Sequence, residues 1–315
     1  MESWSIHDGD ADSGRIFPLD KEYTRSVDGL YRSGVVSLLT NAERLGIIGF
    51  DGKEYPIPSM KEVGRLIARN RSLVDQKYLQ GFDRLELTPL GISSHVLIER
   101  LREAVVKHAA EGTIFKTRKF PSEPQVPVRV NAEKQAWVWE TLYAALDTDE
   151  MVYFPENYTL EHHGMNKAET ITDRHICAVP GWSVGLVENQ PILPQPDEGL
   201  TLNARRQLEI GLSPREYLEM MSDPSYRGET GMTLEDFITG FLVRLESTGE
   251  VSHDVKDNNA LWCLAQYMRV SYAELVPTGR WHHEVGRVRL DMHRTGNRQC
   301  TKSWGAATMV RLVGG

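Results

Sequence analysis

The first half of the chain alternates helical stretches with short extended ones. Ser59-Met60-Lys61-Glu62 is a capping box that predicts a helix start, followed by apolar residues at helical spacing. A longer helix is expected over 93–111, ending at Gly112, which readily adopts positive φ. FDRLELTPL alternates as a strand does, and the proline-rich segment 118–130 predicts an extended connector. We expect a flexible arm over 1–25 and helix from about residue 27.

The second half has more strand-like segments and two strong helix starts. Ser213-Pro214-Arg215-Glu216 combines a serine cap, proline at the first helical position and glutamate at the third. Thr233 caps a second helix whose apolar stripe continues to Leu245. The segment 182–188 alternates as a strand does. We therefore predict an α+β protein, with a helix-rich N-terminal region over 26–149 and a second domain over 150–315.

The segment 285–313, VGRVRLDMHRTGNRQCTKSWGAATMVRLV, has an unusual pattern. Its two ends alternate apolar and polar residues, whereas its middle, 291–303, is almost entirely polar. The ends predict two strands with one face in the core, carrying Val285, Val288, Leu290, Val310 and Leu312. We expect Trp304 to pack inside, because three small residues follow it, and Trp281 to lie on the surface.

Composition and charge exclude several classes of protein. With 36 Lys and Arg against 44 Asp and Glu, the formal charge of −8 argues against a nucleic-acid binder. No apolar run reaches the ~18 residues of a transmembrane helix, and the N-terminus lacks a signal-peptide core. These features predict a cytoplasmic or virion-associated protein. Cys177, Cys263 and Cys300 lie far apart and predict free thiols rather than a disulfide framework or a zinc site.

Catalytic motifs are sparse. His162-His163, His175, His253, His282-His283 and His293 could ligate a transition metal, which leaves a metal-dependent enzyme as an alternative. Adjacent histidines in an extended segment point to opposite faces, however, and no HExxH motif or GxSxG elbow occurs. The segment 49–55 has two glycines, but its Asp-Gly pair predicts a hairpin turn rather than a phosphate-binding loop. We predict no enzyme activity and no cofactor.

The last third of the chain resembles the variable proteins of diversity-generating retroelements. PTGRWHHEVGRVRL (277–290) resembles the opening of their variable region, 291–303 resembles their diversified positions, and WGAATMVRLV (304–313) resembles their closing strand. The helices at 213 and 233 suit the pair that packs on the family's sheet. The resemblance covers about 150–313 and implies a C-type-lectin-like fold related to formylglycine-generating enzymes.

Three departures from related families limit what the resemblance implies. Formylglycine-generating enzymes use a nearby cysteine pair, whereas Cys263 and Cys300 are far apart here, which removes the basis for that chemistry. Gln195-Pro196-Asp197 resembles a calcium-lectin loop, but no Trp-Asn-Asp strand accompanies it. Ala307 stands where the family's closing strand usually has arginine. Neither calcium nor sugar binding is expected.

In that family, mutagenic reverse transcription at template adenines rewrites chosen codons. Such changes are tolerated where side chains are exposed, because core replacements commonly cost about 2–5 kcal/mol. The resemblance therefore implies a non-enzymatic protein whose variable C-terminal surface binds a protein or cell-surface ligand. A structural virion protein remains a further alternative. The expected contact residues are Trp281, His282, His283, Arg287, Arg289, Asp291, His293, Arg294, Asn297, Arg298, Gln299, Thr301 and Lys302.

Overall fold

A computed structural model describes residues 17–40, 43–161, 164–254, 260–296 and 303–314. Within them, eight α-helices span Leu19–Arg32 (α1), Met60–Arg69 (α2), Arg71–Leu79 (α3), Ser94–Glu111 (α4), Glu140–Ala145 (α5), Lys167–Thr172 (α6), Pro214–Met221 (α7) and Leu234–Thr248 (α8). The strands are Ser37–Leu38 (β1), Leu45–Ile48 (β2), Glu54–Pro56 (β3), Arg84–Thr88 (β4), Ala136–Val138 (β5), Met151–Tyr153 (β6), Ser183–Val187 (β7), Thr201–Leu202 (β8), Arg205–Arg206 (β9), Glu229–Gly231 (β10), Ala260–Trp262 (β11), Gln266–Val270 (β12), Ala273–His282 (β13), Arg287–Arg294 (β14), Trp304–Ala306 (β15) and Thr308–Arg311 (β16).

Local sequence signals predicted the helix ends well. Ser59, Ser213 and Thr233 each accept a hydrogen bond from the third helical residue, whose carboxylate in turn accepts from the cap amide. Gly112 ends α4 at φ 67°, in the left-handed region where glycine avoids strain. These four predictions are confirmed because capping depends on residues close in sequence.

The first helix begins earlier in the chain than predicted. Helix α1 begins at Leu19 rather than at about residue 27, so residues 19–25 of the expected arm are helical. Residues 1–16 lie outside the described part. The Asp51-Gly52 turn joins β2 to β3 as expected, with Gly52 at φ 78°.

Two larger sheets form the framework. The four-stranded sheet has the order β10-β16-β7-β4, and in the other β13 is central. One edge of β13 pairs with β14, while its other edge pairs with β12 near Ala273 and with β11 near Gly279. The strand β15 pairs parallel with β11, which brings the closing segment back to the sheet.

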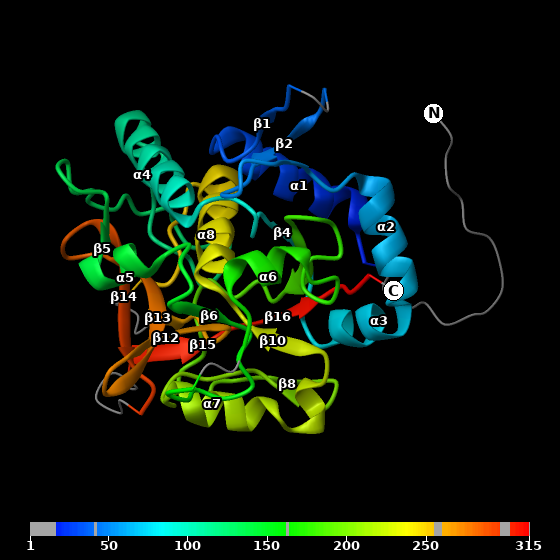
Figure 1. Cartoon of the computed structure of the whole chain (residues 1–315). Coiled ribbons are helices and arrows are strands. Elements are labelled where there is room, and N and C mark those ends of the chain that lie inside the picture. The colour runs from blue at the N-terminus through cyan, green and yellow to red at the C-terminus, as the bar shows by residue number, and fades with distance from the viewer. Residues whose placement is uncertain (1–16, 41–42, 162–163, 255–259, 297–302, 315) are drawn as a thin grey trace.

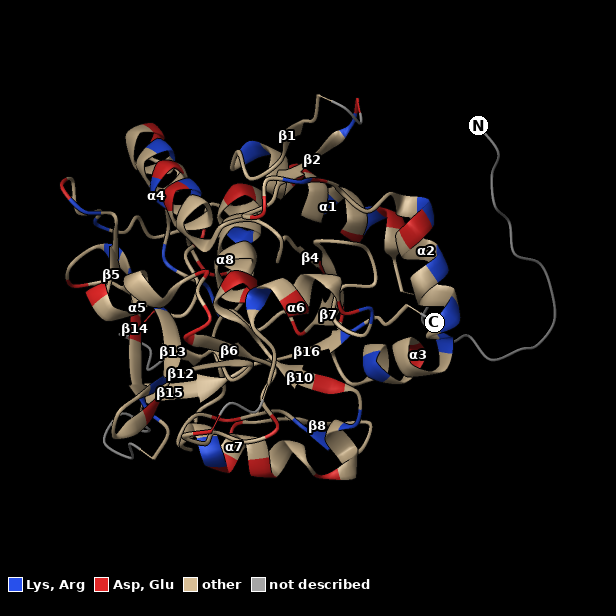
Figure 2. Ribbon diagram, in the orientation of Figure 1, with Lys and Arg blue, Asp and Glu red and all other residues tan. Residues whose placement is uncertain are grey.

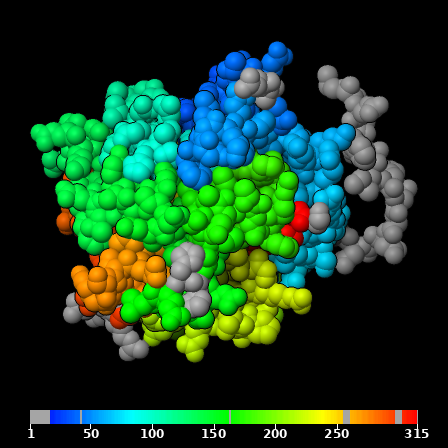
Figure 3. All heavy atoms as spheres, viewed as in Figure 1, coloured from blue at the N-terminus to red at the C-terminus, as the bar shows by residue number. Residues whose placement is uncertain are grey.

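Both sheets cross the boundary that we expected near residue 150. In the first, β4 pairs with β7, and in the second β14 pairs with β5. Helix α8 packs between α1 and α4 and covers β4 and β13 (Figure 1). In the space-filling view an orange surface from the C-terminal part lies directly against the green surface from the middle of the chain (Figure 3). Buried residues from both sides of residue 150 therefore belong to one hydrophobic core cluster.

Close packing around α8 depends on two glycines. A Cβ on Gly29 of α1 would lie 2.9 Å from the Cα of Val243, and one on Gly279 of β13 would lie 2.4 Å from the ring of Phe237. Contacts this short leave no room for a side chain, so α8 lies against the backbone of both neighbours. The α+β prediction, with more helix in the N-terminal part and more strand in the C-terminal part, is confirmed. No helix in the described ranges is long and apolar enough to cross a membrane.

Candidate ligand-binding surface

The hairpin of β13 and β14 carries most of the expected contact residues that the structure describes. Arg280 pairs with Arg289, and His282 pairs with Arg287, in the antiparallel register. Side chains alternate between the two faces of a strand. These four residues therefore lie on the same face as Asp291 and His293, the next alternate positions of β14. We call this the outer face, and it comprises Arg280, His282, Arg287, Arg289, Asp291 and His293.

The opposite face of the hairpin belongs to the core. Val288 and Leu290 are fully buried and Met292 nearly so. Trp281 is also fully buried, with its ring stacked on Phe241 at a centroid distance of 6.5 Å. The prediction that Trp281 lies on the surface is therefore wrong, because β13 alternates from Arg280 onward and turns the indole inward. Trp304 is buried as expected.

Trp137 of β5 anchors the arginines of the outer face. The guanidinium of Arg289 lies 4.6 Å from the centre of the Trp137 ring, and that of Arg287 lies 5.9 Å from it. Such cation–π contacts stabilise a long side chain in one position. Strand β5 is parallel to β14, which places Trp137 directly opposite Arg289. Sequence analysis missed Trp137 because about 150 residues separate it from the hairpin.

Asp291 is the one carboxylate among the six residues of the outer face, and it is buried. Arg289 Nη2 lies 2.7 Å and His293 Nε2 lies 3.6 Å from its Oδ2. Burial raises the pKa of Asp291. The hydrogen bond and charge of His293 and the charge of Arg289 lower this pKa by more, so it lies below its usual value. Asp291 thus holds two neighbouring side chains in place and is less available to a ligand than they are.

The histidines of this region differ in their surroundings. Burial and the charges of Arg280 and Arg289 lower the pKa of His282, which favours its neutral form. His293 packs edge-on against Trp304, with ring centres 4.3 Å apart. His283, beyond the end of β13, lies 3.2 Å from a carboxylate oxygen of Asp254.

The exposed end of the hairpin continues the arginine–aromatic pattern. Arg294 is exposed, and its guanidinium lies 5.3 Å from the ring centre of Tyr272, which is 75% exposed. Arg215 of α7 pairs with Glu274 at 3.1 Å near the same end. Sequence analysis missed Tyr272 and Arg215. Five expected contact residues lie outside the described part: Asn297, Arg298, Gln299, Thr301 and Lys302.

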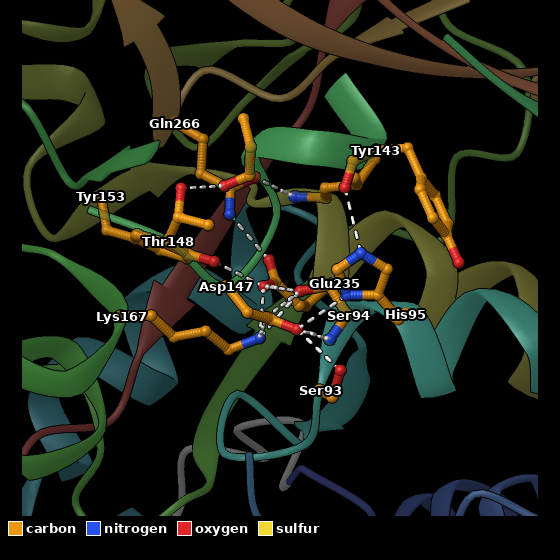
Figure 4. Close-up of polar contacts among 12 residues, drawn as sticks. Ser93, Ser94, His95, Tyr143, Asp147, Thr148, Tyr153, Lys167, Glu235 and Gln266 are labelled. Atoms are coloured by element: carbon orange, nitrogen blue, oxygen red, sulfur yellow. Dashed lines mark hydrogen bonds and ion pairs between the residues drawn. The ribbon is translucent and has the colours of Figure 1, made fainter. Parts of the chain in front are cut away.

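A second polar group is enclosed in the interior, at the starts of α4, α6 and α8 (Figure 4). Lys167 Nζ lies 2.5 Å from Asp147 Oδ1 and 3.2 Å from Glu235 Oε1, and its side chain is 2% exposed. Ser94 donates to both carboxylates. Tyr153 and Gln266 complete the shell by donating to Glu235. We call these six residues the ionic cluster.

Asp147 is the hub of the ionic cluster. Its carboxylate accepts from the Ser94 amide and from the Ser93 hydroxyl, at the positive end of α4. Burial raises the pKa of Asp147, but the Lys167 charge and these hydrogen bonds lower it by more. Every charge in the ionic cluster has a partner, so its role is to join helix starts that are far apart in sequence.

The described residues give little support for a metal site. They include no group of three or more His, Cys, Asp or Glu side chains arranged to hold a metal ion. His162 and His163 lie outside the described part. Cys177 and Cys263 are buried free thiols, and burial raises the pKa of Cys177 to about 12.

Comparison with known proteins provides no assignment. No family model, no curated protein and no solved structure matches this chain.

Proposed function

We propose that this chain is a ligand-binding protein of the diversity-generating retroelement type, with a C-type-lectin-like fold and a variable outer face at its C-terminal hairpin. The observation that carries the proposal is the division of β14 into two faces. Val288, Leu290 and Met292 are buried, whereas Arg287, Arg289 and His293 between them are partly exposed. A gene that varied only the second set would leave the core unchanged.

The chemistry of the outer face favours an acidic ligand. Arginine outnumbers acidic residues there, and Arg294 adds a further positive charge at its end. Trp137 and Tyr272 hold three of these arginines through ring contacts, which lowers the entropy lost on binding. Figure 2 shows acidic residues spread over many helices, so the positive outer face contrasts with the chain's overall charge of −8. We propose a protein or cell-surface ligand that presents carboxylates.

Sibling sequences from the same source test the proposal. We expect differences concentrated at adenine-rich codons of 282–302, at outer-face positions, with Trp281, Val288 and Leu290 unchanged. A neighbouring reverse transcriptase gene with an imperfect repeat of the segment coding for the C-terminus is also expected. Differences scattered evenly along the chain would contradict the proposal.

Oligomeric state separates this proposal from a structural virion protein. We expect light scattering to give the same mass for the original chain and for Arg289→Glu, because the outer face is free to meet a ligand. A stable multimer that dissociates on Arg289→Glu would instead indicate that the face makes fixed subunit contacts.

A further inference from the structure

A cavity of about 300 Å³ opens between α8 and the four-stranded sheet, away from the outer face. Its lining comes from α1, β4, the segments 187–191 and 252–253, and α8. The residues that bear on its chemistry are Arg84, Glu86, Phe237, Phe241, Arg244 and His253. It is large enough for a small organic molecule as well as for several waters.

Two buried polar side chains in this lining have unused hydrogen-bonding atoms. Glu86 is 6% exposed, and its Oε1 has no partner among the described residues. His253 is 9% exposed, its Nδ1 is likewise unpartnered, and its backbone has a φ of 55°. Buried polar atoms are normally satisfied, and non-glycine residues with positive φ gather at functional sites. The unpartnered polar atoms of Glu86 and His253 and the positive φ of His253 therefore all occur in the wall of one cavity.

The surroundings of both groups favour their uncharged forms. Burial, together with the charge of Asp236, raises the pKa of Glu86 to about 8. Burial, together with the charge of Arg244, lowers the pKa of His253 to about 3. Glu86 consequently presents a protonated carboxyl group, which can donate a hydrogen bond.

The charged groups around the cavity are predominantly positive. Arg25 and Arg84 share Glu22, with Asp83 at 3.9 Å from Arg84. Arg118 and Arg244 share Glu250. Three arginines, Arg25, Arg84 and Arg244, line the cavity itself, so guanidinium groups outnumber ionised carboxylates in its wall. Glu188, which also lines the cavity, pairs with Arg205 at 3.0 Å, so it does not offset this excess.

We propose that this cavity binds a small organic monocarboxylate, with its charged end toward Arg244 and Glu86 and its apolar body against Phe237 and Phe241. The guanidinium groups of the wall attract the negative charge of the ligand. The carboxyl group of Glu86 donates a hydrogen bond to it. The two aromatic rings, 6.2 Å apart, supply the apolar wall. This site is independent of the outer face and of the proposed function.

The probe is benzoate, titrated into the full chain by calorimetry at neutral pH. We expect saturable binding at one site, with benzamide and benzylamine at least about tenfold weaker because they lack the negative charge. The absence of saturable benzoate binding would overturn the proposal and leave a cavity that holds only water. Equal binding of benzamide would overturn it as well.

Gly240 of α8 allows a steric test. A Cβ there would lie 3.2 Å from Glu86 Oε2, inside the cavity wall. Gly240→Ala should weaken benzoate binding about tenfold or more while the helix remains intact. Gly64→Ala is the matched control, because Gly64 is also helical and its Cβ would make only an ordinary 3.5 Å contact with Leu19. Equal affinity of the two variants would overturn the proposal.

Two further variants identify where benzoate binds. Arg244→Gln removes a cavity charge and should abolish binding, whereas Arg289→Ala on the outer face should leave it unchanged. Glu86→Gln keeps an uncharged donor and should retain affinity within about threefold. Loss of binding in Arg289→Ala with retention in Arg244→Gln would place benzoate on the outer face and overturn the cavity proposal.

Discussion

The outer face of the hairpin and the ionic cluster are both rich in charge, but they differ in how those charges are satisfied. In the ionic cluster, Lys167 is held between Asp147 and Glu235 and is almost completely buried. On the outer face, Arg287 and Arg289 rest on Trp137 and remain partly exposed. The first arrangement fixes the positions of three helices, whereas the second leaves its arginines able to meet a ligand.

This difference matters because a buried charge and an exposed one respond differently to substitution. Removing one partner of a buried pair leaves an uncompensated charge in a medium of low polarity. Removing an exposed arginine leaves water in its place. Stability measurements can therefore separate the part of the chain that holds the fold from the part that is free to vary.

Lys167→Ala should have the largest effect. It leaves Asp147 and Glu235 without their shared cation, and we expect the free energy of unfolding to fall by about 3–5 kcal/mol. Chemical denaturation measures this. Lys53→Ala, which breaks an exposed pair with Asp51, is the control and should change little. Similar losses in both variants would remove the contrast between buried and exposed charge.

Two neighbours on β14 test the contrast within one strand. Leu290→Ala should cost about 2–5 kcal/mol, because its fully buried side chain would leave a cavity in the core. Arg289→Ala should cost less, since its side chain is 32% exposed and His293 remains beside the buried Asp291. The measurement is the urea midpoint of each variant. Comparable losses of stability in the two variants would mean that the outer face also stabilises the fold.

Asp147→Asn tests the pH dependence of the ionic cluster. We expect a loss of about 1.5–3 kcal/mol at neutral pH, because charge-assisted hydrogen bonds are weakened. The folded pKa of Asp147 lies below its unfolded value of about 3.9. Its contribution is therefore complete above the unfolded value and is lost as the pH falls through the folded pKa. Unfolding curves between neutral and acidic pH should converge for the original and variant chains; parallel curves would be inconsistent with this account.

The smallest effect is expected for the three arginines Arg287, Arg289 and Arg294 of the hairpin as a set. Replacing Arg287, Arg289 and Arg294 together by alanine should cost no more than about 0.5 kcal/mol per position. Binding to an acidic ligand should be lost at the same time. Thermal unfolding and a pull-down with the cognate ligand measure the two effects separately. A cooperative loss of stability would show that these arginines are structural.

Sequence signals near one another in the chain predicted much of the local structure. The caps at Ser59, Ser213 and Thr233 are correct, as is the hairpin at Asp51-Gly52. Long-range pairing was not predicted, since nothing near Trp137 indicates that β5 lies beside β14. Nor did any local signal indicate that both sheets draw strands from each side of residue 150. The function, like the C-type-lectin-like fold, stays a proposal.

The sequence by itself determined where the helices capped by Ser59, Ser213 and Thr233 begin and where a polar tract interrupts the alternating pattern, because these features depend on residues within a few positions of one another. Only the tertiary structure decided which charges are enclosed. Asp147, Lys167 and Glu235 have no common motif, yet folding brings them together in the core. Trp281 is next to Arg280 in sequence, but the alternation of β13 turns its ring against Phe241. Burial depends on what the rest of the chain places over a side chain, which no local pattern specifies.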